Sequence, residues 1–146
     1  MTKAEYDALL AEGGKIIEAD ISWSQDKSLS YVSEFFVKLE SESGYPLTIK
    51  GSYNRVLKKN NYTLFSPKVG RIFAVDYDRK HGDAGEFHVH SWDGTKCVAT
   101  KAVAPAGIEG DPVRLWKWFC EQAGIIHSGT FGSPPPLPPS DQNEMF

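Results

Sequence analysis

Residues 71–94 read RIFAVDYDRKHGDAGEFHVHSWDG and carry the clearest strand pattern in the chain. The pattern predicts two strands, 71–78 and 86–92, joined by a polar loop, 79–85, that contains two glycines. Residues two apart on a strand share a face. Burying the apolar residues of both strands together fixes the parity of an antiparallel hairpin, because a one-residue slip would turn one set outward. We expect the buried set to be Phe73, Val75, Tyr77, Phe87 and Val89.

The same parity gathers polar side chains on the opposite face of the hairpin. These side chains are Asp76, Asp78, Glu86, His88 and His90. The two histidines are two residues apart, so their Cα atoms are expected about 7 Å apart along one strand. Imidazole titrates near neutral pH and serves as an acid, a base or a metal ligand. This face is therefore the candidate active site.

The rest of the chain predicts an α+β fold, in which an antiparallel β-meander is flanked by an N-terminal and a C-terminal helix. Asn60 and Asn61 suit a tight turn of this meander, because asparagine tolerates positive φ. Further strands are expected over residues 21–24, 31–40, 47–53, 62–65 and 96–103.

Both helices carry capping signals. Thr2 and Glu5 form a capping-box pattern at the start of the N-terminal helix. Asp111 and Pro112 suit the N-cap and first position of the C-terminal helix, and Gly124 suits its end. The apolar stripe expected on the N-terminal helix consists of Tyr6, Leu9, Leu10, Ile16 and Ile17.

The composition changes after Gly129. Residues 133–140 read SPPPLPPS, which favours an extended polyproline II conformation and cannot join a sheet. We therefore expect residues 1–129 to form a single domain and residues 130–146 to form a disordered, flexible, proline-rich tail. The alternative role of this tail is a docking peptide for an aromatic-lined groove.

The chain has 146 residues, of which 40% are hydrophobic, and a formal net charge of −3. These values favour a globular protein and argue against one that coats nucleic acid along its whole surface. Residues 43–75 nevertheless contain no Asp or Glu, which predicts a local phosphate-binding patch. The alternative is a solvated sheet edge on which lysines discourage aggregation. The basic residues predicted to bind nucleic acid are Arg55, Lys58, Lys59 and Lys68.

The cysteines and the hydropathy pattern predict the cellular compartment of the protein. Cys97 and Cys120 cannot build a disulfide framework, and neither belongs to a metal-type C-x-x-C pair. The N-terminus has no apolar signal core, and no run approaches the roughly 18 apolar residues of a membrane helix. We expect a cytoplasmic protein with no membrane partner.

Three interpretations fit the two histidines. In a metal-independent ribonuclease without a cofactor, His88 and His90 would act as base and acid beside Asp76, while Arg71 would offset phosphate charge. In a metal centre, His88, His90, Asp76 and Asp78 would supply imidazole and carboxylate ligands. In the third interpretation, both histidines only cover the sheet.

The order of a strand with R-x-x-x-x-D, a loop with His and Gly, and a strand ending in H-x-H resembles small bacterial and phage proteins related to the TumE-like toxin family of toxin–antitoxin systems. The resemblance covers residues 31–100 and implies an activity on RNA, which favours the ribonuclease interpretation. The chain departs from the family at Tyr77-Asp78 and at the turn Trp92-Asp93-Gly94, and its proline-rich tail is additional. The matching residues are Arg71, Asp76, His81, Gly82, His88 and His90.

These departures keep a second class of function open. A related chain without catalysis would be an interaction protein of phage–host conflict that binds a protein or nucleoprotein partner, such as an antitoxin or a defence component. Its support is the acidic termini, the proline-rich tail and the four tryptophans. Replacing His88 or His90 should abolish a nuclease activity and leave such a partner bound.

Overall fold

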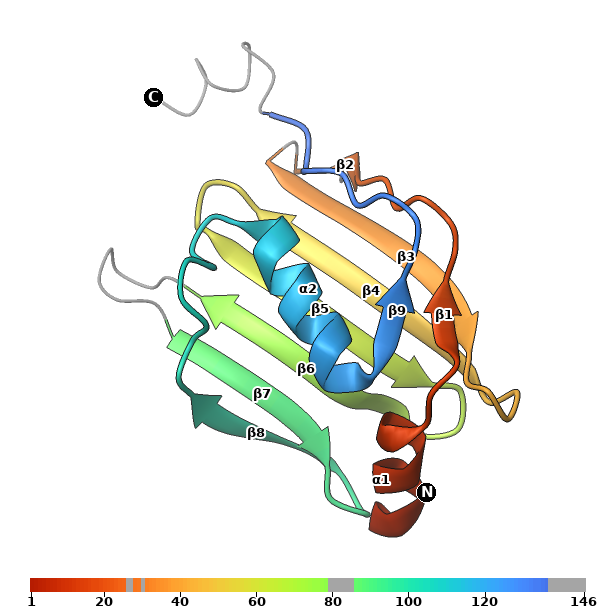
Figure 1. The fold of residues 1–146 in the computed structure, drawn as a ribbon. Coiled ribbons are helices and arrows are strands. Elements are labelled where there is room, and N and C mark those ends of the chain that lie inside the picture. The colour runs from red at the N-terminus through yellow and green to blue at the C-terminus, as the bar shows by residue number, and fades with distance from the viewer. Residues whose placement is uncertain (26–27, 30, 79–85, 137–146) are drawn as a thin grey trace.

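One antiparallel sheet of seven strands, in the order β2-β3-β4-β5-β6-β7-β8, forms the body of the protein (Figure 1). Each strand pairs with the next one along the chain, which makes the sheet a meander. The computed structural model describes residues 1–25, 28–29, 31–78 and 86–136. The strands are β2 Ser24–Gln25, β3 Val32–Glu40, β4 Pro46–Asn54, β5 Lys59–Ser66, β6 Gly70–Asp78, β7 Glu86–Trp92 and β8 Cys97–Ala102.

Two helices flank the meander in sequence, as predicted, and confirm the α+β class. Helix α1, Lys3–Ala11, begins with the expected capping box of Thr2 and Glu5. Helix α2, Pro112–Ala123, begins where the Asp111 carboxylate accepts a hydrogen bond from the Arg114 amide at 3.0 Å. Among the described residues, no helix is long and apolar enough to cross a membrane.

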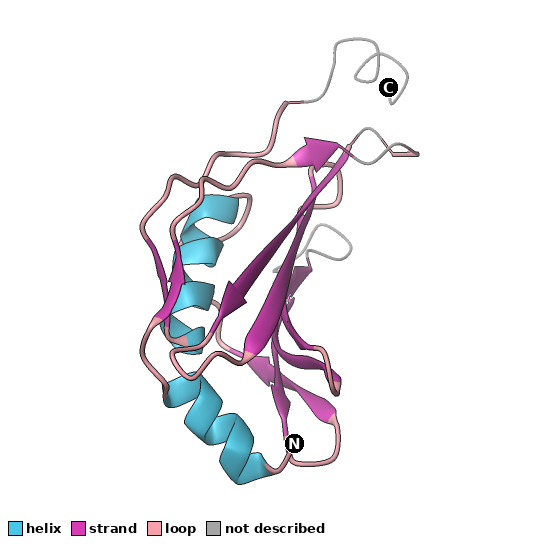
Figure 2. Ribbon diagram, turned by 90° about the vertical axis from the view of Figure 1, so that its right-hand side faces the viewer, coloured by secondary structure: helices cyan, strands magenta, loops and turns pink. Residues whose placement is uncertain are grey.

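Both helices lie on the same side of the sheet (Figure 2). They share this side with a small parallel sheet of β1, Lys15–Ile17, and β9, Ile125–His127. The core fills the space between α2 and the sheet, and its rings include Phe35, Tyr62, Phe73, Trp116 and Phe119. The opposite face of the sheet, which points away from α2, is called the outer face below.

The central hairpin has the predicted register. Val75 pairs with Val89, and Asp76 pairs with His88. Phe73, Val75, Tyr77 and Phe87 are buried, and Val89 is half-buried against the same core. The parity argument is therefore confirmed, and it places the carboxylate of Asp76 and the ring of His88 on the outer face.

The predicted turn at Asn60-Asn61 is wrong, because both residues lie within β5. The turn lies at residues 55–58. The side-chain oxygen of Asn54 accepts hydrogen bonds from the amides of residues 56 and 57, both at 3.0 Å. Lys58 then adopts a positive φ of 56° and completes the reversal. An asparagine does initiate the turn, but through its side chain and six residues earlier than expected.

The predicted helical stripe is also wrong at its C-terminal end, because Ile16 and Ile17 lie in β1. Helix α1 ends at Ala11, and Gly14 takes a positive φ of 77° in the connection. Lys15 is fully buried, and its ammonium donates to the carbonyl oxygens of Leu9 and Leu10 at 2.7 and 3.1 Å. This contact satisfies backbone acceptors at the end of α1 and compensates for the buried charge.

The packed part of the chain continues past the predicted boundary at residue 129. Ile21 donates from its amide to the carbonyl oxygen of Thr130 at 2.9 Å. The Phe131 ring stacks on Trp116 with ring centroids 4.9 Å apart and an interplanar angle of 4°. Trp23 donates from its indole to the carbonyl oxygen of Gly132 at 2.9 Å. Residues 130–132 therefore pack with the domain, and residues 137–146 of the predicted tail lie outside the described part of the chain.

Replacing Phe131 with Ala should lower the free energy of unfolding by about 2–3 kcal/mol, because it removes a ring that packs on Trp116 and Phe35. Chemical denaturation followed by tryptophan fluorescence measures this loss. Ile126→Ala is the matched control, because Ile126 is 61% exposed and should contribute little. Equal losses in the two variants would show that residues after 129 are not part of the packed unit.

Candidate functional site

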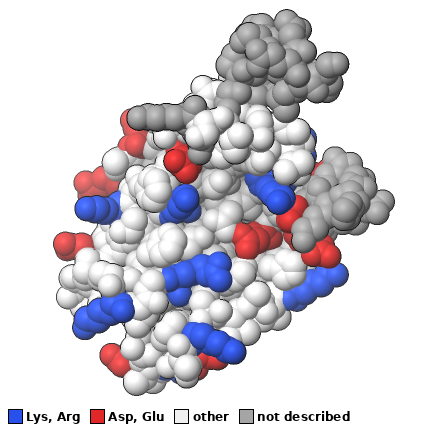
Figure 3. Space-filling model, turned by 180° about the vertical axis from the view of Figure 1, so that it is seen from behind, with Lys and Arg blue, Asp and Glu red and all other residues white. Residues whose placement is uncertain are grey.

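The outer face is a polar surface on which basic and acidic side chains are interspersed (Figure 3). The register places one residue of each of six strands in a single row across this face. This row consists of Glu34, Ser52, Asn61, Asp76, His88 and Lys101. Its centre, at Asp76, is the candidate site.

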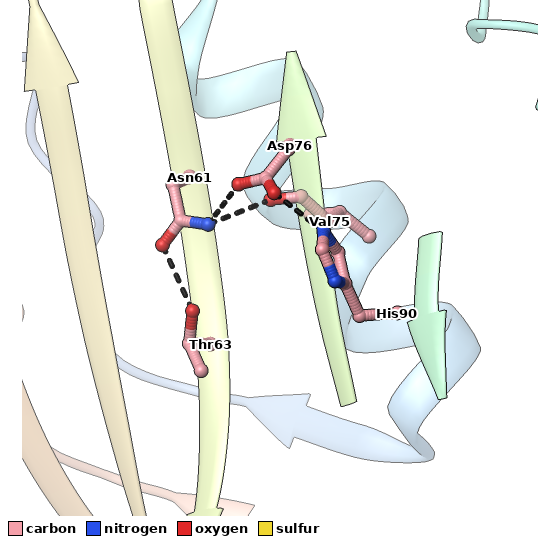
Figure 4. A network of polar contacts seen from close by, with 5 residues as sticks. All are labelled: Asn61, Thr63, Val75, Asp76 and His90. Atoms are coloured by element: carbon pink, nitrogen blue, oxygen red, sulfur yellow. Dashed lines mark hydrogen bonds and ion pairs between the residues drawn. The ribbon is translucent and has the colours of Figure 1, made fainter. Parts of the chain in front are cut away.

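Asp76 is held from both neighbouring strands (Figure 4). On the β7 side, Nε2 of His90 lies 2.6 Å from Oδ2 of Asp76. On the β5 side, the Asn61 amide donates to Oδ1 of Asp76 and, at 3.4 Å, to the Val75 carbonyl oxygen. The Thr63 hydroxyl donates to Oδ1 of Asn61 at 2.8 Å, which fixes the orientation of the amide. Three strands thus hold one carboxylate in a single orientation.

The Asp76–His90 pair presents its carboxylate to solvent, and its imidazole is largely covered. The His90 side chain is 12% exposed, whereas the Asp76 side chain is 33% exposed. A carboxylate can only accept, so Nε2 of His90 carries the proton of their hydrogen bond. Nδ1 of His90 is buried and has no hydrogen-bond partner among the described residues. His90 therefore orients Asp76 and offers no free nitrogen to a substrate.

His88 is the second imidazole of the site. It stands directly across from Asp76 on one side and from Lys101 on the other, and it is half-buried. Directly opposed residues on antiparallel strands have Cα atoms about 4.5–5.5 Å apart. Its ring is therefore within reach of a group bound at the Asp76 carboxylate. The structure thus brings His88, His90 and Asp76 together, as the sequence predicted.

Arg71 lies on the same strand as Asp76, near the start of β6. Both residues line a shallow hollow of about 540 Å³ on the outer face. Arg71 also interacts with Cys97, whose thiol pKa is raised by burial, and the Arg71 hydrogen bond opposes that rise. The other residues lining the hollow are Lys50, Ser52, Asn61, Thr63 and Phe65.

The four predicted nucleic-acid-binding residues do not form one patch. Lys59 starts β5 and lines a second hollow beside Asp76. The Lys58 ammonium lies near Gly110, and Arg55 donates to the buried Ser33 hydroxyl at 2.6 Å, so both are directed toward the helix side. Lys68 lies beyond the far end of β5, roughly 23 Å from Lys59 by the rise of a strand. Only Lys59 stands beside the candidate site.

The described residues do not support the metal interpretation. Within them, no group of three or more His, Cys, Asp or Glu side chains is placed to hold a metal ion. Nε2 of His90 is engaged by Asp76, and Asp78 lies 3.8 Å from the ammonium of Lys59. The four predicted ligands therefore do not converge on one point, and we do not retain the metal centre as a proposal.

The sequence did not predict that Asn61 and Thr63 help to hold the Asp76 carboxylate in position. Both residues lie on β5, and their contact with Asp76 depends on the pairing of β5 with β6. That pairing contains an irregularity between Leu64 and Phe65, which breaks the simple alternation. The available signal was the polar residue at every second position of residues 59–63, but Asn60 and Asn61 were predicted to form a turn and the strand was expected to start at residue 62.

Replacing Asp76 with Ala should remove the hydrogen bond that orients the His90 ring. In the native protein, we expect the ring N–H of His90 to exchange slowly enough to give a proton resonance in a nitrogen-15-resolved spectrum. The Asp76→Ala variant should lose this resonance. Asp78→Ala is the matched control and should keep it, since Asp78 faces Lys59. A histidine ring spectrum unchanged by Asp76→Ala would contradict the Asp76–His90 pair.

Comparisons with family models, with curated proteins and with solved structures found no match to this chain. The resemblance to the TumE-like toxins therefore rests on the residues quoted for it. The structure describes Arg71, Asp76, His88 and His90 of that set, and all four lie on β6 and β7. His81 and Gly82 lie outside the described residues. The assignment of a function has to come from the geometry of the site.

Proposed function

We propose that this chain is a metal-independent ribonuclease that cleaves RNA on the outer face of its sheet. The observation that carries the proposal is the Asp76–His90 contact of 2.6 Å, in which a carboxylate with a side chain 33% exposed is held in one orientation on the outer face. A catalytic or binding group has to be held in position by its neighbours, and Asp76 receives hydrogen bonds from two neighbouring strands. The resemblance to the TumE-like toxins adds RNA as the substrate class.

In the proposed reaction, Asp76 and His88 each carry out one proton transfer. The Asp76 carboxylate, as general base, removes the proton of the ribose 2′-hydroxyl. The 2′-oxygen then attacks the adjacent phosphorus, a 2′,3′-cyclic phosphate forms, and the bond to the 5′-oxygen breaks. His88, as general acid, protonates the departing 5′-oxygen. Asp76 gains one proton and His88 gives up one, so the two transfers balance, and the reaction needs no cofactor.

This assignment differs from the pairing of His88 with His90 that the sequence suggested. A general acid or base needs a nitrogen or oxygen that reaches the substrate. The His90 ring has one nitrogen bonded to Asp76 and the other buried. His90 is therefore a positioning residue, which orients the carboxylate and donates a hydrogen bond to it.

Phosphate charge is balanced from the hollow beside Asp76. Lys50 and Arg71 line this hollow, and Asp76 is its one acidic residue. A guanidinium offers a planar fork of donors that matches a phosphate, and an ammonium adds a compact charge. Both cations therefore stabilise the additional negative charge on phosphorus in the transition state. Lys59 supplies a third cation from the neighbouring hollow.

The competing proposal is an interaction protein that uses the same outer face. Its specific support is Phe36, which is 64% exposed on this face, and the mixture of charges around it. A protein or nucleoprotein partner, such as an antitoxin or defence component, would contact this surface without using Asp76 as a base. The two proposals differ in the expected effect of Asp76→Asn. The change should remove the activity of a ribonuclease, whereas an interaction protein should still bind its partner.

The purified chain should cleave single-stranded RNA in the presence of EDTA and leave 2′,3′-cyclic phosphate ends. Asp76→Asn and His88→Gln should each lower the rate about 100-fold or more, because each removes one proton transfer. His90→Gln should lower the rate less than Asp76→Asn. Asp78→Asn, on the same strand and face, is the matched control and should retain the rate. No cleavage by the native chain, or equal rates in all variants, would refute the ribonuclease.

RNA binding should weaken steeply with salt, because cations release counterions from phosphate. Replacing Lys50 and Arg71 together with Gln should flatten the slope of log affinity against log salt by up to about two units. Lys58→Gln serves as the control, since Lys58 is directed toward Gly110 and away from the hollow. Fluorescence anisotropy with a labelled oligonucleotide measures both slopes. A slope that responds to Lys58 and not to the hollow would place the RNA elsewhere.

A further inference from the structure

An exposed aromatic ring lies on the outer face near one edge of the sheet, on β3. Phe36 is 64% exposed, although its neighbour Phe35 is buried against Trp116. The two rings point to opposite faces of β3, as the alternation of a strand requires. The Lys50 ammonium lies 5.5 Å from the centroid of the Phe36 ring and also 3.9 Å from Glu34. The Lys50 ammonium therefore lies over one face of the ring, and the side chain stays largely exposed to solvent.

Phe36 stands in register with the strand that carries the candidate site. Phe36 pairs with Lys50, Lys50 with Thr63, and Thr63 with Ala74 of β6. Ala74 lies two residues before Asp76 and on the same face. Neighbouring strands are about 4.8 Å apart, so three steps place the Phe36 ring roughly 14 Å from β6 across the sheet. Stacked nucleotides of one strand are about 3.4 Å apart, so this distance corresponds to about four of them, and to fewer when the strand is extended.

The surface between Phe36 and Asp76 suits a phosphodiester chain. It is the hollow of about 540 Å³ that Lys50 and Arg71 line. Its neutral polar side chains are those of Ser52, Asn61 and Thr63, of which Asn61 and Thr63 donate within the site. Among the described residues that line it, the apolar one is the half-buried Phe65. Two cations and one carboxylate are among the described residues that line the hollow, and Glu34 lies 3.9 Å from the Lys50 ammonium.

We propose that Phe36 is a stacking platform for an unpaired base of single-stranded RNA, within about four nucleotides of the phosphate that is cleaved at Asp76. This inference rests on the proposed ribonuclease and narrows its substrate to unpaired RNA. Aromatic rings on an open sheet bind bases of any identity, because every base has a flat face. Paired bases are stacked within their own helix and cannot reach the ring.

The test compares two substrates with the same scissile bond. One is a ribodinucleotide, and the other is a hexanucleotide with one ribose at its centre and deoxyribose elsewhere. The native chain should cleave the hexanucleotide with a kcat/KM about 5- to 100-fold higher, the contribution of one stacked base. Phe36→Ala should lose this gain, and Phe36→Tyr should keep it. Ile126→Ala is the matched control, with 61% exposure in β9 on the opposite side, and should keep the gain.

Failure of the platform and failure of the nuclease give different results. Cleavage of both substrates with no gain for the longer one, or a gain that survives in Phe36→Ala, would overturn the platform alone. If no substrate is cleaved, the proposed function fails, and binding of the all-deoxy hexanucleotide tests the platform by itself. Binding that Phe36→Ala weakens at least 5-fold would support it. Absence of binding would overturn it and leave this face to a protein partner.

Discussion

Burial of one face of the sheet against α2 is the constraint on which the rest of the structure depends. The Tyr62 hydroxyl donates to the carbonyl oxygen of Pro112 at 2.6 Å, and the rings of Phe73 and Phe119 stack 5.6 Å apart. These contacts hold the strands in one parity, since a slip of one residue would expose the core. Every second side chain is then turned to the outer face. The alignment of Asp76 with His88 follows from how the core packs.

The hairpin and both helix caps could be predicted because their signals are local. The alternation of apolar and polar residues over 71–92 sets the register of the hairpin. Thr2 with Glu5, and Asp111 with Pro112, mark the starts of the two helices. The parallel pairing of β1 with β9 could not be predicted, because three-residue strands carry no periodicity and their partners are 110 residues apart. Phe131 was assigned to the tail for the same reason: its partners, Trp116 and Phe35, are distant in sequence.

The site was only partly predictable. The sequence shows that His88 and His90 share a strand face, but it does not show which of their ring nitrogens can reach a substrate. His88 and His90 look equivalent in H-x-H, but the structure leaves His90 with one nitrogen bonded to Asp76 and one buried. The segment 43–75, which has no Asp or Glu, is continuous in sequence, yet the meander places Lys58 and Lys68 beyond opposite ends of β5. Two other cations of the same segment, Lys50 and Arg71, line the hollow beside Asp76.

The most direct test of the central claim is a map of amide chemical shifts during titration with an oligodeoxynucleotide, which lacks the 2′-hydroxyl and cannot be cleaved. The account predicts that the largest shifts follow the outer face, at Lys50, Asn61, Asp76 and His88, on β4 to β7. The amides of α2 and β9, on the covered side, should shift little. Shifts centred on α2 or β9, or none at all, would contradict an RNA site on the outer face.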